Sequence, residues 1–312
     1  MAKYVFGVDV GGTTVKIGLL DETGKLLEKW EIKTRTENNG ENILPDVAAS
    51  LNAKLQEKNI DKSEVIGVGV GVPGPVDSEG TVHRAVNLNW GEFSVSDTLS
   101  KLTGLKATAG NDANVAALGE MWQGGGKGIK NQVMVTLGTG VGGGIIVDGK
   151  ILAGFSGAGG EIGHMHVEDN EEKACGCGNH GCFEQYTSAT GITRMAEKHF
   201  AAWNKETVLK AGDINAKTVF DGFKAGDALC KEIVAEFGEY FGKGLATIAS
   251  VLNPEAFVIG GGVSKAGQCV IDAAVPAFEK YAFPGAVKNC KMLLATLGND
   301  AGMYGAAKLV IG

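Results

Sequence analysis

The sequence predicts an α/β protein of two lobes, each built around a β-hairpin whose turn carries glycine and threonine. Near residue 1 and again near residue 131, the chain shows the same series: apolar strand, Gly/Thr turn, strand, Gly-Lys turn, strand. Glycine is also abundant, with 49 residues against 6 prolines, and it clusters directly after apolar runs. Two unrelated hairpins are the alternative, because such turns are common. The equivalent placement of the glycines favours a duplication.

The first third of the chain alternates strands and helices. Three strands are expected in KYVFGVDV, TTVKIGLL and LLEKWEIKT. A helix is expected at about residues 42–58, since apolar residues recur there at helical spacing, at Ile43, Val47, Leu51 and Leu55. The apolar strand EVIGVGVGV then runs into the turn PGPVD, and a strand in LKATAG precedes a helix in DANVAALGEMW.

The second half of the chain is expected to contain longer helices. One spans about residues 229–252 and stops at Asn253-Pro254, with Ile233, Phe237, Phe241, Leu245 and Ile248 on one face. The strand AFVIGGG follows it, then a helix beginning near Ser264, and the segment AGMYGAAKLVI is a helix that packs back on the first lobe. The expected lobes are residues 1–110 plus 298–312 and residues 111–297, joined by a hinge.

Composition excludes several classes of protein. The formal net charge is −7, which argues against a broad nucleic-acid interface, because such an interface needs a basic face. No apolar run approaches the ~18 residues of a membrane span, and the first apolar run is too short for a signal peptide. The expectation is a soluble cytoplasmic protein. In a reducing compartment, clustered cysteines are more often metal ligands than disulfides.

The glycine clusters predict contacts with phosphate groups. Glycine at the end of a strand lets backbone N–H groups approach an anion without an intervening Cβ. Three such clusters occur: Gly11, Gly12 and Thr13; Gly138, Thr139 and Gly140; and Gly260, Gly261 and Gly262. Asp9 is a candidate to hold Mg²⁺ or its waters, and Lys16 adds a positive charge or a structural pair. One cluster alone is more often a plain tight turn.

A set of polar side chains at loop ends predicts a site for a polyhydroxylated ligand. Asn111 and Asp112 stand at the start of a predicted helix, Glu161 lies in a glycine-rich loop, and Glu184 follows the cysteine loop. Each hydroxyl of such a ligand needs a partner once water is excluded. Taken alone, Asp112 is better explained as a helix N-cap.

The loop CGCGNHGC predicts a zinc site. Cys175, Cys177 and Cys182 supply three thiolates, and one histidine would complete a closed tetrahedral set. The candidates for the fourth ligand are His164, His166 and His180. With no position left for water, the zinc would be structural. Three free cysteines are the alternative; Cys230, Cys269 and Cys290 are isolated and are expected to be plain buried residues.

These residues resemble the ROK family (repressors, open reading frames, kinases), and in particular its bacterial glucokinases. The resemblance covers essentially the whole chain. It is carried by DVGGTTVK at Asp9–Lys16, Asn111-Asp112, GTGVGGG at 138–144, EIGH at 161–164 and CGCGNHGCFEQYTSA. The pairing of EIGH with C-x-C-x4-C is the most specific part.

The resemblance implies a two-lobed actin-like, ribonuclease-H-like ATPase fold with ATP and sugar in the cleft. Phosphates would lie on Gly11–Thr13 and Gly138–Gly140, with the nucleoside near Gly260–Gly262. Asp112 would be the general base on the sugar hydroxyl. The sugar would be held by Gly74, Asn111, Glu161, His164 and Glu184. His164 would be the fourth zinc ligand, and the protein would be a homodimer that binds glucose or a related hexose.

Several alternatives remain open at this point. The family also contains sugar-responsive repressors, but these carry a DNA-binding segment ahead of DxGGT, where this sequence offers only eight residues. A non-catalytic sugar sensor would be expected to lose the base, and a chaperone or cytoskeletal ATPase has no reason for the zinc loop. Fructose, mannose and N-acetylmannosamine are alternative substrates, since specificity among hexoses rests on single hydrogen bonds. Polyphosphate is an alternative donor.

Overall fold

A computed structural model describes residues 3–312, and this part of the chain forms two compact units. Unit 1 contains the chain up to Lys130, together with Gly144–Gly160 and Thr296–Gly312; unit 2 contains Asn131–Gly143 and Glu161–Ala295. Residues 111–130, 144–160 and 296–297 are expected from the sequence in the second lobe, whereas the structure places them in unit 1.

Two five-stranded sheets have the same strand order, which confirms the duplicated architecture. The first is β3 (Leu26–Lys33), β2 (Thr14–Asp21), β1 (Tyr4–Val10), β4 (Val65–Val72) and β7 (Ala107–Asn111). The second is β10 (Lys150–Ile151), β9 (Val141–Val147), β8 (Gln132–Leu137), β11 (Ala256–Gly260) and β12 (Lys291–Leu294). In each sheet the first strand of the unit pairs in parallel with a later strand, β1 with β4 and β8 with β11. A short antiparallel pair joins β5 (Thr81–Val82) to β6 (Phe93–Ser94).

The helices follow the predicted apolar spacing. Unit 1 contains α1 (Ile43–Lys58), α2 (Val95–Thr103), α3 (Asp112–Gln123) and α10 (Ala301–Ile311). Unit 2 contains α4 (Glu184–Thr187), α5 (Ala189–Ala202), α6 (Ala216–Lys224), α7 (Ala228–Leu252), α8 (Cys269–Tyr281) and α9 (Pro284–Val287). The apolar residues predicted on α1 and α7 are all buried. Asn253 ends α7 with a left-handed backbone, just before Pro254.

One predicted helix start is wrong. The residues around Ser264 form a single 3₁₀ turn, η5 (Val263–Ala266), and the α-helix begins only at Cys269. The interruption falls at Gly267, whose φ of +89° is incompatible with a continuing right-handed helix.

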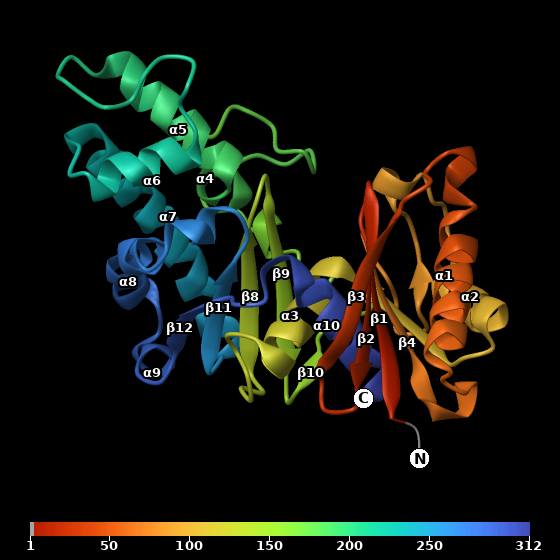
Figure 1. Cartoon of the computed structure of the whole chain (residues 1–312). Helices are drawn as coiled ribbons and strands as arrows, with labels where there is room; N and C mark the ends of the chain where they lie inside the picture. Colours follow the sequence, from red (N-terminus) through yellow and green to blue (C-terminus); the bar gives the residue numbers. More distant parts are fainter. Residues whose placement is uncertain (1–2) are drawn as a thin grey trace. The chain divides into compact units, whose positions relative to one another are not determined.

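The first sheet is covered on both faces: α1 and α2 lie against one face of β1 and β4, as Figure 1 shows, and α10 packs against the other. Phe6, Val8 and Val10 of β1 pack in one core cluster with α1 and α2, whereas the alternating Val5 packs with Ala307 and Val310 of α10. This alternation is the period of two expected of a strand. Burial on both faces explains why these strands read as nearly continuous apolar runs.

Helices α3 and α10 pack at very short range because glycine is present at their contact. A Cβ on Gly305 would lie 1.5 Å from the carbonyl oxygen of Val115, and one on Gly119 would lie 2.2 Å from that of Ala301. No side chain fits at either position. This packing is the reason that residues 111–130 belong to unit 1, with α10, and not to the second lobe.

Candidate active site

The turn between β1 and β2 has the tight geometry predicted for a phosphate-binding loop. The Gly11 N–H donates to the carbonyl of Thr14 at 3.1 Å. From the end of β3, the Thr34 hydroxyl donates to the Gly11 carbonyl at 2.7 Å, and the Thr34 N–H donates to the Thr13 carbonyl at 2.9 Å. Thr34 is buried and fixes the turn from the neighbouring strand, a role that no sequence pattern indicates.

Asp9 lies at the end of β1 in an environment that disfavours its charge. Burial raises the pKa of this carboxyl to about 6; Lys16 opposes the shift, and the Asp112 and Asp300 carboxyls add to it. The Lys16 ammonium also donates to the carbonyl of Asn299 at 3.3 Å. A carboxylate held near two others is stabilised by a divalent cation, which is consistent with the role predicted for Asp9.

Asn111, not Asp112, caps helix α3. Its Oδ1 accepts from the backbone N–H groups of Ala113 at 3.0 Å and Asn114 at 3.1 Å. Its Nδ2 donates to the carbonyl of Gly74 at 3.0 Å and to Oδ1 of Asp112 at 3.0 Å. The capping alternative for Asp112 is therefore wrong, and the exposed Asp112 carboxyl is oriented by its neighbour at the first position of the helix.

In unit 2, the predicted Gly138–Gly140 turn lies beside Glu184. The Gly138 N–H donates to the Gly140 carbonyl at 2.9 Å. The carboxylate of Glu184 accepts from the Val141 N–H at 3.3 Å, and a Cβ on Gly140 would lie only 2.6 Å from its Oε2. Glycine at 140 is thus what allows a predicted sugar-binding carboxylate to approach a predicted phosphate-binding turn.

A cavity of about 540 Å³ opens next to the same turn. Of the predicted phosphate and nucleoside residues, Thr139 and Gly262 line it. Gly260 and Gly261 do not: they pack against Met134 and the Leu137 backbone, respectively. The sequence analysis missed the other polar residues of the lining, which come from α5, α6 and η5: Thr190, Thr193, Asn215, Lys217, Asp221, Lys224 and Lys265. Except for Lys265, these lining residues lie far from the glycine clusters in the sequence, so the clusters gave no indication of them.

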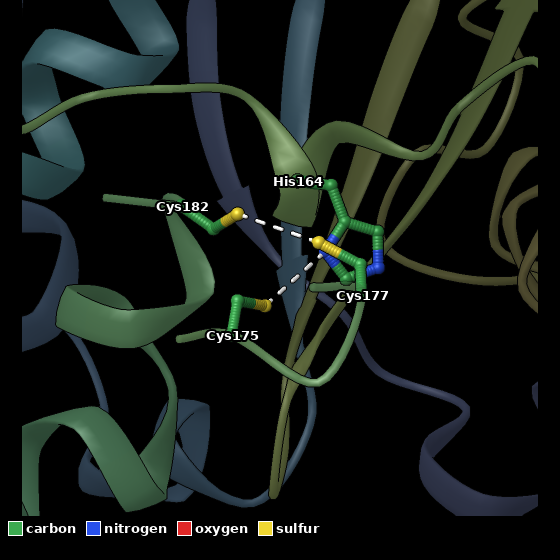
Figure 2. Close-up of side chains that lie close together, drawn as sticks. All are labelled: His164, Cys175, Cys177 and Cys182. Carbon is green, nitrogen blue, oxygen red and sulfur yellow. Dashed lines mark hydrogen bonds between the residues drawn. The ribbon is translucent and has the colours of Figure 1, made fainter. Parts of the chain in front are cut away.

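The three clustered cysteines and His164 converge on one point, as Figure 2 shows. Their candidate ligand atoms all lie within 4.8 Å of one another. The Sγ atoms of Cys177 and Cys182 are 3.7 Å apart, and Sγ of Cys175 is 3.7 Å from Nδ1 of His164. A tetrahedral zinc ion with Zn–S bonds of about 2.3 Å separates its sulfurs by about 3.8 Å. These side chains therefore fit zinc in both type and spacing.

The other two histidines have different partners. The ring of His166 contacts Asp169 at 2.8 Å and the His180 carbonyl at 3.0 Å, whereas Nδ1 of His180 lies 3.0 Å from the Glu171 carbonyl. Of the three candidates, His164 is thus the one grouped with the cysteines. Outside the cluster, Cys230 is buried as expected, but Cys269 and Cys290 are partly exposed.

The cysteine cluster adjoins two of the predicted sugar-binding carboxylates. Nε2 of His164 lies 4.0 Å from Oε2 of Glu161, while Cys175 Sγ donates to Oε1 of Glu184 at 3.0 Å. Carboxylates that contact metal ligands orient those ligands and tune the basicity of the ligand atoms. The expected grouping of Glu161, His164 and Glu184 is therefore present within unit 2.

The loop that carries the cysteines is also held by an ion pair outside the cluster. Glu171 pairs with Arg194 of α5 and accepts a hydrogen bond from the Tyr186 hydroxyl at 2.7 Å. The Arg194 guanidinium lowers the pKa of Glu171 to about 2. Because the folded-state pKa lies below the ordinary value of 4.5, this pair stabilises the protein above about pH 4.5, and the contribution is lost as the pH falls toward 2.

We expect Glu171→Gln to lower the free energy of unfolding by about 2 to 3 kcal/mol at pH 7, because Arg194 loses its counter-charge. The difference from the unsubstituted protein should shrink when unfolding is measured at pH 3, where Glu171 is partly protonated in the unfolded chain. Urea titrations at both pH values check this. The matched control is Glu172→Gln, at the exposed neighbouring position. An equal effect of Glu171→Gln at both pH values would contradict the electrostatic origin.

Among residues 3–312, no helix is both long enough and apolar enough to cross a membrane.

Comparison with known proteins gives matches along the whole chain. The model of the ROK family matches residues 5–312. A glucokinase of Halalkalibacterium halodurans is 43% identical, over 99% of this chain and 95% of that protein. A glucokinase of Thermotoga maritima is 36% identical, over 98% of this chain and 96% of that protein.

Among solved structures, a ROK family glucokinase from Streptomyces griseus, in complex with glucose and AMPPNP, resembles this chain with a TM-score of 0.75. It is 34% identical, and the match covers 98% of each chain. The matches cover residues of both units, and the chain belongs to the ROK family.

Proposed function

Because the chain belongs to the ROK family, with its two-lobed actin-like fold, we propose that the protein is an ATP-dependent glucokinase. It transfers the γ-phosphoryl group of ATP to the 6-hydroxyl of glucose. The observation that carries this proposal is the similarity to glucokinases over nearly the full length of the chain.

Asp112 acts as the general base on the sugar hydroxyl. Phosphoryl transfer has a loose transition state, so the protein has little covalent chemistry to perform and works mainly by positioning and charge stabilisation. The hydrogen bond from Asn111 and the cap that Asn111 provides for α3 support this role, because they orient the carboxyl of Asp112. The hexose is held by Gly74, Asn111, Glu161, His164 and Glu184.

The nucleotide is bound by the two glycine turns and by the cavity next to Thr139. Lys217, Lys224 and Lys265 in the lining of that cavity suit a polyanion. The buried Asp9 carboxyl would hold Mg²⁺ or its waters, and the ion would supply charge neutralisation at the phosphates of ATP. Lys16 is the neighbouring cation, and Gly262, which lines the cavity, lies near the nucleoside.

Cys175, Cys177, Cys182 and His164 are proposed to hold a structural zinc ion. Four protein ligands leave no open position, so the ion supplies cross-linking and not Lewis-acid chemistry. The contact of Cys175 with Glu184, and that of His164 with Glu161, link the cluster to the groups proposed to bind the sugar. The proposal also includes a cytoplasmic homodimer, as the family resemblance implies; light scattering after size-exclusion chromatography measures the oligomeric state.

The test is a phosphorylation assay on purified protein with Mg-ATP. Glucose, mannose, fructose, N-acetylglucosamine and N-acetylmannosamine are compared at equal concentration, with ADP release read against a sugar-free blank. A parallel series replaces ATP by inorganic polyphosphate. We expect the highest kcat/KM with glucose and ATP. A preference for another hexose would support sugar kinase activity and identify a substrate other than glucose. The absence of sugar-dependent ADP release with every sugar would contradict the proposal and favour a sensor.

A further inference from the structure

Gly302, in the first turn of α10, is a buried glycine that lies directly against Asp9, the group proposed to hold Mg²⁺. A Cβ at position 302 would lie 2.7 Å from Cγ of Asp9, 2.9 Å from its Oδ2 and 3.0 Å from its Oδ1. Non-bonded carbon atoms pack at about 3.5 to 4.0 Å. The Asp9 carboxylate therefore occupies the space that any side chain at 302 would need.

Other glycines at the contacts of α10 meet backbone atoms instead. A Cβ on Gly7 of β1 would lie 2.0 Å from the carbonyl oxygen of Met303, and one on Gly69 of β4 would lie 1.6 Å from that of Ala306. A side chain at either position would prevent the helix from packing on the sheet. At Gly302, by contrast, the three nearest atoms outside its own helix all belong to one carboxyl group, which can rotate away. Glycine at 302 is thus explained by the position of one side chain and not by the packing of the helix.

The start of α10 is fixed within unit 1, so the helix is not free to move away from Asp9. Glu120, fully buried on α3 (0% exposed), accepts from the Leu297 N–H at 2.8 Å and from the Thr296 N–H at 3.0 Å. A buried carboxylate is costly unless it is hydrogen-bonded, so these bonds hold the segment that leads into the helix. Just before the helix, the Asp300 carboxylate pairs with Lys29 of β3 at 2.8 Å. A side chain at 302 would therefore displace the Asp9 carboxylate and not the helix.

We propose that Gly302 is a positioning residue, whose lack of a side chain keeps the Asp9 carboxylate in the orientation that binds Mg²⁺ or its waters. The inference rests on the proposed function, because that function assigns Mg²⁺ to Asp9. Octahedral sites for this ion tolerate little displacement of their oxygen ligands, which lie at about 2.0 to 2.1 Å. A carboxylate pushed aside by one methyl group would no longer meet this requirement.

The test is Gly302→Ala, which adds a single methyl group. Alanine favours a helix more than glycine does, so the melting temperature should be unchanged or slightly higher. Calorimetry with and without Mg²⁺ measures how much the ion adds to the affinity for AMPPNP, and the variant should lose most of this increment. No chelator is used, so that the proposed zinc ion stays bound. The kcat for glucose should fall about 10- to 100-fold, as is typical when a residue that orients a metal ligand is changed.

Gly91→Ala is the matched control. It makes the same replacement at an exposed glycine of unit 1, where the added Cβ would have no atom within 4 Å. It should keep the increment and kcat within about twofold. Asp9→Asn, alone and combined with Gly302→Ala, shows whether the methyl group acts through Asp9. We expect Asp9→Asn to lose the increment and the double variant to lose no more, because both changes affect the same group.

Loss of the increment in Asp9→Asn but not in Gly302→Ala would overturn the inference and leave the glucokinase proposal intact. A lower melting temperature of Gly302→Ala, or additive losses in the double variant, would overturn it too, because glycine at 302 would then serve the packing of α10. An increment that Asp9→Asn retains would contradict the role proposed for Asp9, and the inference with it. Failure of the proposed function would instead show as an unsubstituted protein that phosphorylates no sugar.

Discussion

Asp112→Asn is expected to lower kcat for glucose by about 10²- to 10⁴-fold, the range typical of a lost general base, with the KM for ATP little changed. The variant should fold normally, because Asp112 is exposed and the cap of α3 is provided by Asn111. Asparagine also retains an oxygen at the position where Oδ1 of Asp112 accepts from the Ala113 N–H at 2.8 Å. The change therefore removes basicity and leaves the local structure in place.

Steady-state kinetics with a coupled ADP assay measure this effect. The matched control is Asp97→Asn, which makes the same chemical change at an exposed acidic residue in the first turn of α2. It should leave kcat within about twofold, because one surface charge near a helix terminus contributes less than about 1 kcal/mol. A kcat for Asp112→Asn within that same range would remove Asp112 from the role of base.

Cys177→Ala is expected to abolish stoichiometric zinc binding and to lower the free energy of unfolding by about 3 kcal/mol or more. Cys177 is exposed, so alanine creates no core cavity there. The lost free energy of unfolding therefore measures the contribution of metal binding. The melting temperature should fall by several degrees. The KM for glucose should rise, because the cluster contacts Glu184 through Cys175 and Glu161 through His164.

Metal content by mass spectrometry, thermal unfolding and glucose kinetics on the same preparation separate these effects. Cys290→Ala, which removes a thiol outside the cluster, is the control and should retain the zinc. Loss of zinc and of stability with an unchanged KM for glucose would mean that the cluster supports the fold alone. Unchanged metal content in Cys177→Ala would contradict the zinc assignment itself.

Local patterns predicted most of the fold correctly. The helical spacing of Ile43, Val47, Leu51 and Leu55 placed α1 to within a residue. The repeated hairpin predicted a duplicated architecture, which the equal strand order of the two sheets confirms. The helix start near Ser264 was wrong, because spacing alone does not show that Gly267 adopts a left-handed backbone.

Local sequence patterns do not predict contacts between segments that are distant in the chain. Glu120 accepts from amides more than 170 residues away in sequence, and nothing in the apolar period of α3 indicates that a carboxylate is buried there. Thr34 and the pair of Glu171 with Arg194 were missed for the same reason. The zinc ligands were predictable because three of them lie within eight residues, and resemblance to the family selected His164 as the fourth.

The position of α10 has a consequence for synthesis on the ribosome. Val5 and Leu20, from strands that are translated before unit 2, are covered by Ala307 and Val310, which are translated after it. One face of the first sheet therefore stays apolar and uncovered while nearly three hundred residues are added. Unit 2 can complete its core during translation, but unit 1 cannot. The nascent chain is thus expected to need chaperone protection of its amino-terminal sheet until the last helix is made.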